Sequence, residues 1–246
     1  MSTGGTTNIL YISEAFSSEN SPDYQYVLRV NTTRPVLGIS RAREQLVLAA
    51  ISSYPWAPLV VGVSDQWLLS PFYCDVKDSE ADLSAIVSVV ADLQSMPIKH
   101  VNQQLYIDYE ALWDSYRRVI VKEANDDKQQ RWHLLLDTVK KAFDQLPVVA
   151  NVWTHHDLHP GNVVTNGKHK ILLDWEYAGI GSPWVDAYGL NQYWHVPREV
   201  LHQTLAVFAV LTPDEMETGL GLTNQWLTAL DTLWREVNNI ESGLGG

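Results

Sequence analysis

Two aspartates and an asparagine lie close together between residues 153 and 179, in the stretch WTHHDLHPGNVVTNGKHKILLDWEYAG. Asp157 and Asn162 are five residues apart in a polar segment, and Asp174 follows a short apolar run. In phosphoryl transfer, one aspartate accepts the proton of an attacking hydroxyl, while an asparagine and a second aspartate hold magnesium. The metal is needed because phosphate oxygens repel the incoming nucleophile. The spacing of these three residues therefore indicates phosphoryl-transfer chemistry.

The segment between the two aspartates predicts a β-hairpin. Asn166-Gly167 favours a two-residue type I′ turn, in which both central residues have positive φ, and β-branched and apolar residues flank it. Such a turn would pair Asn162 with Ile171. Asp174 would then lie three residues beyond that partner, at most roughly 10 Å along the strand. We expect the polar loop and the second carboxylate to meet at one end of this hairpin.

The composition is that of a globular protein with an acidic surface. Seventeen basic and 29 acidic residues give a net charge of −12, which argues against a nucleic-acid-binding surface. This charge would suit a cationic small substrate, although solubility explains it equally well. The single cysteine, Cys74, excludes an intrachain disulfide and is typical of a reducing compartment. With no visible signal peptide and no long apolar run, we expect a cytoplasmic protein without a membrane span.

The patterns along the chain predict an α+β protein with two lobes. Residues 1–73 would form a small β-rich N-lobe, with strands at 8–13, 24–30, 59–63 and 66–70 and a helix at 40–52. Residues 74–246 would form a larger helical C-lobe that carries the polar loop and the hairpin. Its helices are expected at 79–95, 106–122, 126–146, 184–193, 199–211 and 223–239. A cleft between the lobes is the expected ligand site.

The segments THHDLHPGNVV and ILLDWEYAG resemble the aminoglycoside phosphotransferase and choline kinase superfamily. Its signature is H-[GN]-D-x-x-x-x-N followed by a hairpin that ends in I-D-[WF]-E. The DWEYAG form is most similar to thiamine kinases and to choline or ethanolamine kinases. The resemblance implies a protein-kinase-like fold, with ATP and Mg²⁺ as cofactors and a small-molecule alcohol as acceptor.

The resemblance also implies roles for individual residues. Asp157 would be the catalytic base, Asn162 and Asp174 the magnesium ligands, and His155 and Asp186 braces of the loop. The nucleotide contacts would come from the N-lobe. Gly4 and Gly5 would cover the nucleotide as a glycine roof, and Arg29 would contact the α- and β-phosphates, with Glu44 as its partner on the helix. The connector from Ser70 through Phe72 to Tyr73 would be the hinge that contacts adenine.

Two departures from the family pattern concern the nucleotide roof and the catalytic loop. The chain begins almost at Gly4, so the strand that usually precedes the roof would be missing or very short. His156 stands where the family has glycine or asparagine. The shortened start leaves a catalytically inactive nucleotide-binding module as one alternative. A zinc hydrolase built on the three clustered histidines is another alternative.

The acceptor is expected to bind beside the acidic centres. Glu176 follows Asp174 by two residues and could accept a hydrogen bond from the substrate. Aromatic residues are frequent after residue 153, and an aromatic wall with carboxylates suits a cation. We take Trp184, Tyr193 and Trp234 as candidates for that wall. A thiamine-like or choline-like alcohol is therefore the preferred acceptor, with aminoglycosides or sugars as alternatives.

Overall fold

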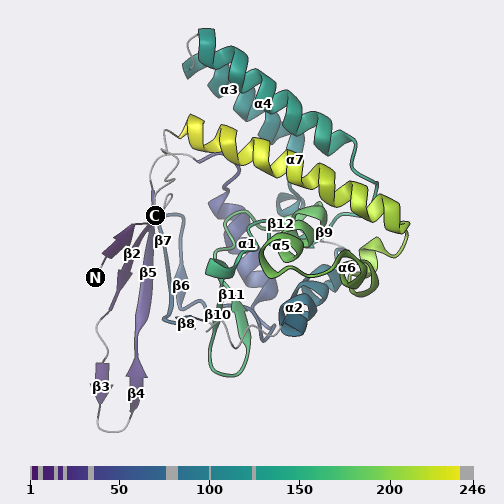
Figure 1. Cartoon of the computed structure of the whole chain (residues 1–246). Helices are drawn as coiled ribbons and strands as arrows, with labels where there is room; N and C mark the ends of the chain where they lie inside the picture. The colour runs from purple at the N-terminus through teal and green to yellow at the C-terminus, as the bar shows by residue number, and fades with distance from the viewer. Residues whose placement is uncertain are drawn as a thin grey trace.

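A computed structural model describes residues 2–4, 8–13, 16–18, 21–32, 36–75, 83–99, 101–123 and 126–238. The N-terminal part is an antiparallel sheet of five strands in the order β1-β2-β5-β7-β6, seen at the left of Figure 1. These strands are β1 (Ser2–Gly4), β2 (Asn8–Ile12), β5 (Tyr26–Asn31), β7 (Trp67–Pro71) and β6 (Gly62–Val63). A hairpin of β3 (Phe16–Ser18) and β4 (Ser21–Tyr24) extends the β2–β5 pair. The strand expected to be missing or very short is present as the three-residue β1.

Alternation along the strands gives this sheet two different faces. Asn8 is buried on β2, whereas the neighbouring Ile9 and Tyr11 are about half exposed. On β5, Arg29 is buried opposite Leu10. Successive side chains of a strand point to opposite faces. The buried face therefore carries the polar residues Asn8 and Arg29 toward the rest of the molecule.

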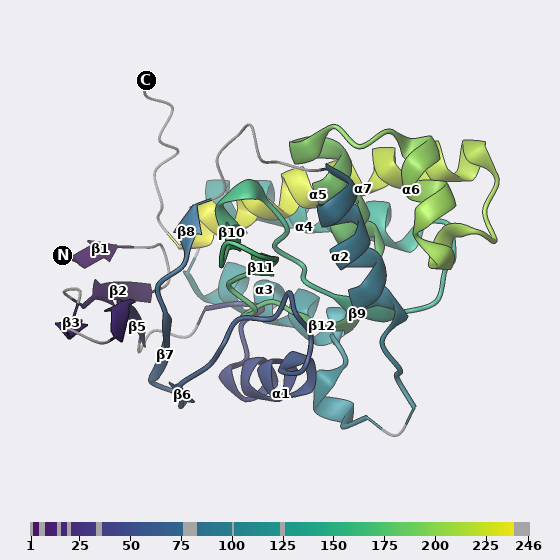
Figure 2. The same ribbon diagram turned by 90° about the horizontal axis from the view of Figure 1, so that it is seen from below.

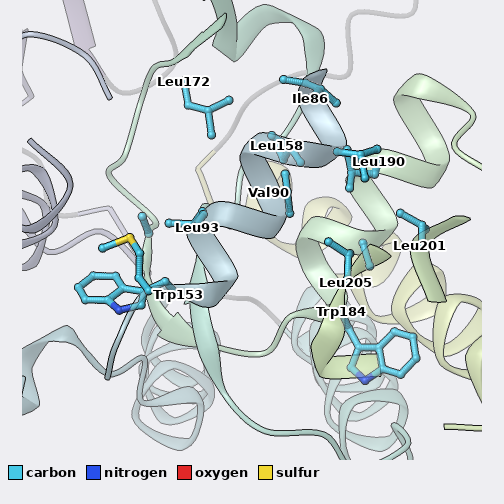
Figure 3. Packing of buried hydrophobic residues seen from close by; sticks show 14 of the residues in the cluster. Ile86, Val90, Leu93, Trp153, Leu158, Leu172, Trp184, Leu190, Leu201 and Leu205 are labelled. Atoms are coloured by element: carbon cyan, nitrogen blue, oxygen red, sulfur yellow. The ribbon is translucent and has the colours of Figure 1, made fainter. Parts of the chain in front are cut away.

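The remainder of the chain is mainly helical, as the sequence predicts. Its helices are α2 (Leu83–Ser95), α3 (Tyr109–Glu123), α4 (Asp126–Asp144), α5 (Trp184–Trp194), α6 (Arg198–Thr204) and α7 (Pro213–Val237). Helices α3, α4 and α7 pack side by side around one apolar cluster. A second cluster joins α2, α5 and α6 to the strands near the polar loop (Figure 3). Among the described residues, no helix is both long and apolar enough to cross a membrane.

Five short strands form two small sheets between the N-terminal sheet and the helical part. β8 (Cys74–Asp75) pairs with β10 (Val163–Thr165), which pairs with β11 (Lys170–Leu172). β9 (Val152–Thr154) pairs with β12 (Gly179–Gly181). Helix α1 (Arg41–Ile51) contacts β12 and the short turn η2 (Gln103–Leu105). Figure 2 shows the sheet at one end of the molecule and α6 at the other, with the hairpin and α1 between them. The lobe boundary at residues 73/74 stays a prediction.

The predicted hairpin register is wrong by two residues. Val163 pairs with Leu172 and Thr165 with Lys170, so the loop has four residues rather than two. The cause is the side chain of Asn166, whose Oδ1 accepts the backbone N–H groups of Lys168 and His169. An asparagine that binds the chain in this way forms an Asx-type turn. As a result, Leu173 instead of Ile171 donates to the carbonyl of Asn162, at 2.8 Å, and Asp174 follows directly.

The last two predicted helices also need correction. α6 ends at Thr204 and gives way to the 3-10 turn η4 (Ala206–Phe208), where a helix was expected to continue to residue 211. α7 begins ten residues earlier than expected, at Pro213. Thr212 starts it with a capping box, since its hydroxyl accepts the N–H of Glu215 and the Glu215 carboxylate accepts the N–H of Thr212.

Gly219 is required where α7 crosses α5. A Cβ on Gly219 would lie 2.1 Å from Cη2 of the buried Trp184 ring, whereas a Cβ on Gly221 would meet nothing within 4 Å. We expect Gly219→Ala to lower the free energy of unfolding by about 1–3 kcal/mol because the core is overpacked. Gly221→Ala should instead raise it by about 0.5–1 kcal/mol through helix propensity. Urea denaturation of both variants tests this contrast, and equal effects at the two positions would contradict it.

Candidate active site

A buried carboxylate holds the start of the polar loop. Asp186 of α5 is fully buried, and its two oxygens accept the backbone N–H groups of His155 and His156 at 2.8 and 2.9 Å. Burial raises the pKa of Asp186 to about 6, although both hydrogen bonds favour the ionised form. Asp186 thus lies where a brace for the loop was expected. It fixes the backbone immediately before Asp157.

His155 connects the loop to the strand that precedes Asp174. Its Nε2 lies 2.8 Å from the carbonyl of Leu173, and its Nδ1 accepts the N–H of Asp157 at 3.3 Å. Burial lowers the pKa of His155, so the ring is neutral at neutral pH, with its proton on Nε2 facing the carbonyl. His155 therefore positions both acidic centres through their backbone.

His156 has a left-handed backbone, with φ of 66°. Glycine and asparagine, the residues expected at this position, adopt this region most readily. Here the ring is held by Tyr109 of α3, whose hydroxyl lies 3.0 Å from Nε2 and accepts the N–H of Ser182 at 2.9 Å. Burial, and after it the charge of Arg43, lowers the pKa of His156 to about 3. His156 is therefore a neutral acceptor from Tyr109.

Asp157 and Asn162 are in direct contact. The Asn162 amide nitrogen donates to the Asp157 carbonyl at 2.8 Å and to its carboxylate at 3.0 Å. His159 Nε2 lies 3.7 Å from the same carboxylate. Burial alone would raise the pKa of Asp157, but His159, His155 and Asn162 outweigh it and hold the pKa below its ordinary value. Asp157 is thus ionised at neutral pH, and its side chain is 37% exposed toward the cavity beside it.

Asp174 faces the same space from the end of the hairpin. It has a left-handed backbone, with φ of 59°, and its side chain is 35% exposed. Burial, followed by the charge of Glu176, raises the pKa of Asp174 to about 7. Arg29 Nη1 donates to Oδ1 at 3.1 Å. The positive φ turns this carboxylate out of the strand direction and into the cleft.

The donor atoms at this point fit magnesium. Asn162 uses its amide nitrogen on Asp157, so its amide oxygen is the atom that it can offer to a cation. Asp174 adds a charged oxygen, and hard oxygen donors are those that magnesium prefers, with phosphate oxygens and water completing its shell. Zinc receives no such support: within the described ranges no group of three or more His, Cys, Asp or Glu side chains could hold a metal.

An ion-pair network joins the sheet and α1 to the hairpin end. Glu44 accepts from Arg29 at 2.6 Å and from Arg41 at 2.9 Å, and it is buried. Arg41 also donates to Glu176 at 2.8 Å and to the side-chain oxygen of Asn8 at 2.9 Å. The sequence predicted the Arg29–Glu44 pair and missed the role of Arg41 and Asn8. Glu176, expected to contact substrate, lines the acceptor-side cavity but is buried and already bound to Arg41.

The nucleotide-side cavity, of about 460 Å³, lies between the sheet and the polar loop. Arg29, Glu44 and Asn162 line it, and the Nε of Arg29 is buried without a partner among the described residues. Ser70 and Phe72 also line this cavity. The N–H of Phe72 donates to Gln25, so this donor of the predicted hinge is already used.

The expected glycine roof is described only in part. Gly4 is the last residue of β1 and pairs with Ile9 of β2. Gly5 lies outside the described residues. The role of both glycines toward a nucleotide stays a prediction.

The acceptor-side cavity, of about 590 Å³, lies on the other side of Asp157 and Asp174. Tyr193 and Trp234 line it, in agreement with the expected aromatic wall, and Tyr116, Tyr177 and Trp226 were missed. The expectation for Trp184 is wrong, since this side chain is 1% exposed, packs on Phe208 and donates to the carbonyl of Pro147. Figure 3 shows it within the core among residues of α5 and α6.

Comparison with known proteins adds a family and a fold. A sequence model described as "Phosphotransferase enzyme family" matches residues 62–217. No curated protein matches. One similar solved structure is a macrolide 2'-phosphotransferase type I, with 17% identity and a TM-score of 0.64 over 98% of this chain and 86% of that one. A second is choline kinase LicA from Streptococcus pneumoniae, with 15% identity and a TM-score of 0.66 over 99% of this chain and 86% of that one. A third is LicA in complex with AMP, with 15% identity and a TM-score of 0.63 over 98% of this chain and 84% of that one. At these identities the likeness concerns the fold, which is protein-kinase-like.

Proposed function

This chain belongs to the phosphotransferase enzyme family, and from that premise we propose that it transfers the γ-phosphate of ATP to a hydroxyl of a small molecule, with magnesium as the metal. One observation carries the proposal: Asp157, Asn162 and Asp174 converge at the point where the nucleotide-side and acceptor-side cavities meet. The AMP complex of a structurally similar choline kinase supports an adenine nucleotide in the first cavity.

In the proposed reaction, Asp157 holds the acceptor hydroxyl and receives its proton. The hydroxyl oxygen forms a bond to the γ-phosphorus, and the bond from that phosphorus to the β–γ bridging oxygen breaks. The electron pair of the broken bond stays on ADP, and the phosphate monoester of the acceptor is the second product. Asp157 suits this role because it is ionised at neutral pH and partly exposed in the acceptor-side cavity.

The other residues of the site act on charge and position. Asn162 and Asp174 would hold magnesium, which when bound supplies positive charge to the phosphate oxygens. Arg29, held by Glu44, is placed to donate to the phosphates from the sheet side. The backbone contacts of Asp186 and His155 keep Asp157 in place before substrate binds, so less ordering is needed in the transition state.

A thiamine-like or choline-like acceptor is the substrate that the sequence favours. The aromatic lining of the acceptor-side cavity supports a flat or apolar acceptor, because aromatic side chains bind such groups and also attract cations. The similar structures include enzymes named for choline and for macrolides, which differ widely in size. The identity of the acceptor therefore stays a prediction.

The proposal is tested with purified protein, ATP, magnesium and a panel of alcohols that includes choline, thiamine, aminoglycosides, sugars and hydroxy acids. We expect at least one alcohol to raise ADP release well above the rate with water, and chelation by EDTA to abolish that rise. Thermal shift with ADP and magnesium runs in parallel, since a bound ligand raises Tm by mass action. A nucleotide-induced rise in Tm without acceptor-dependent ADP release would contradict the proposal and indicate an inactive nucleotide-binding module.

A further inference from the structure

One arginine of the acceptor-side cavity has no carboxylate to balance its charge. Arg43 of α1 lines this cavity, and its Nε donates to the carbonyl of Ala178 at 3.0 Å while Nη2 donates to that of Gly38 at 2.8 Å. Within the described part of the chain, no Asp or Glu oxygen lies within 4 Å of it. Burial lowers the pKa of Arg43, but a guanidinium still stays charged at neutral pH.

The acidic side chains of the cavity each have a basic partner. The pairs are Asp157 with His159 at 3.7 Å, Asp174 with Arg29 at 3.1 Å, Glu176 with Arg41 at 2.8 Å, and Asp231 with Arg235 at 2.8 Å, and both Arg29 and Arg41 also bind Glu44. Of the two described arginines that line the cavity, Arg43 is the one without a carboxylate in contact. A charge that is partly removed from water without a counter-ion costs free energy, and a ligand of opposite charge recovers it.

Arg43 also keeps one donor for such a ligand. Two of its three guanidinium nitrogens are fixed by backbone carbonyls, which hold the group in a single orientation. The third, Nη1, has no protein partner in the described structure, and unlike Nε of Arg29 it is not sealed from solvent. A fixed donor of this kind loses little freedom when a ligand binds.

The position of Arg43 places it near the reacting group. Its charge contributes to the lowered pKa of His156, whose ring is held by Tyr109. His156 precedes Asp157 in the loop, and all four residues line the same cavity. Neither His156 nor Tyr109 offers a negative charge, because the ring is neutral and the hydroxyl is bound to His156 and Ser182. Among the described residues, no side chain in contact with Arg43 supplies a counter-ion.

We propose that the acceptor alcohol carries a carboxylate, which Arg43 Nη1 binds while Asp157 holds the hydroxyl. The aromatic residues Tyr177, Trp226 and Trp234 would cover the apolar body of this hydroxy acid. The inference rests on the proposed function and narrows its acceptor. It runs against the cationic acceptor that the sequence favours, because an ammonium group would meet carboxylates that are already paired and an arginine that is not.

Binding of matched ligand pairs tests the proposal without needing turnover. The pairs are 4-hydroxybutyrate with 1,4-butanediol, and 3-phenyllactate with 3-phenyl-1,2-propanediol, with choline as the cationic probe, each titrated into wild-type protein saturated with ADP and magnesium. A charge-assisted hydrogen bond should make at least one carboxylate bind roughly tenfold to a hundredfold tighter than its neutral partner. Arg43→Gln should abolish this preference, and Arg43→Lys should retain part of it.

The matched control is Arg118→Gln, which removes an equal charge from the exposed surface of α3 and should leave the preference intact. ADP-induced thermal shift checks that each variant is folded. If Arg43→Gln does not fold, the affinities of the matched ligands for wild-type protein decide the test. Three results would overturn the proposal. The two members of every pair could bind with equal affinity, the neutral alcohols or choline could bind more tightly than the carboxylates, or Arg43→Gln could weaken both members of a pair equally. Failure of the proposed function is distinguished from these results, because the ligands would then bind but no alcohol would stimulate ADP release.

Discussion

Asp157→Asn is expected to lower kcat by roughly 10³-fold, within the range of about 10²–10⁴ for loss of a general base. The asparagine side chain has the same size and still forms hydrogen bonds, so the loop and the nucleotide site should persist. An amide does not accept the proton of the acceptor hydroxyl at neutral pH. Steady-state kinetics with the acceptor found in the panel gives kcat, and the Kd for ADP with magnesium should stay within about threefold of wild type.

The pH profile of the wild-type enzyme gives a second measure of Asp157. Its pKa is lowered, and the base must be ionised. With ATP and magnesium at saturation, so that the metal site at Asp174 stays filled, kcat/KM for the acceptor should persist into more acidic buffers than an ordinary carboxylate would allow and fall as pH passes through the lowered pKa. Asp114→Asn, on the exposed surface of α3, is the control and should leave kcat unchanged. A full kcat in Asp157→Asn would show that another group receives the proton.

The chemistry of this site could be predicted from sequence because its parts are local. Asp157, Asn162 and Asp174 lie within eighteen residues, and one loop and one hairpin suffice to bring them together. Even with the wrong register, the hairpin predicted Asp174 near Asn162. The actual four-residue loop brings them closer, and it arises from hydrogen bonds of the Asn166 side chain, which composition rules for two-residue turns do not include.

The contacts that were missed join distant parts of the chain. Arg41 binds Glu176 across 135 residues, and Arg43 binds Ala178 across the same separation. One local signal was available: two arginines stand at the start of α1, where the helix dipole disfavours positive charge. Such residues need partners elsewhere, and here those partners are the end of the hairpin and, for Arg43, the proposed carboxylate of the acceptor.

Packing explains the errors in the helical part. Trp184 was assigned to the substrate wall because aromatic residues cluster in the sequence there, yet its ring fills the space under Gly219 of α7. Gly219 is thus the residue that lets α7 pass over α5. The capping box at Thr212 and Glu215 is a sequence signal for the start of this helix.

Asp174→Asn is expected to lower kcat by at least roughly 10²-fold, because the charge that holds the metal at the phosphates is lost. Magnesium should no longer strengthen nucleotide binding, so the ratio of the Kd for ADP without and with magnesium should fall toward one. Arg29 also loses a partner in this variant, but it keeps Glu44 and should stay in place. Calorimetry with ADP, with and without magnesium, measures the ratio in both proteins.

The raised pKa of Asp174 adds a pH dependence to that ratio. Burial and Glu176 raise the pKa to about 7 when no metal is bound, so a proton competes with the metal below that value. In the wild type, the ratio of the Kd for ADP without magnesium to the Kd with magnesium should therefore increase as pH rises through about 7 and level off above it. ADP titrates equally in both proteins, so the difference between wild type and Asp174→Asn isolates the protein group. If both proteins gave the same ratio at every pH, Asp174 would not hold the metal, and the assignment of the two aspartates to different tasks would fail.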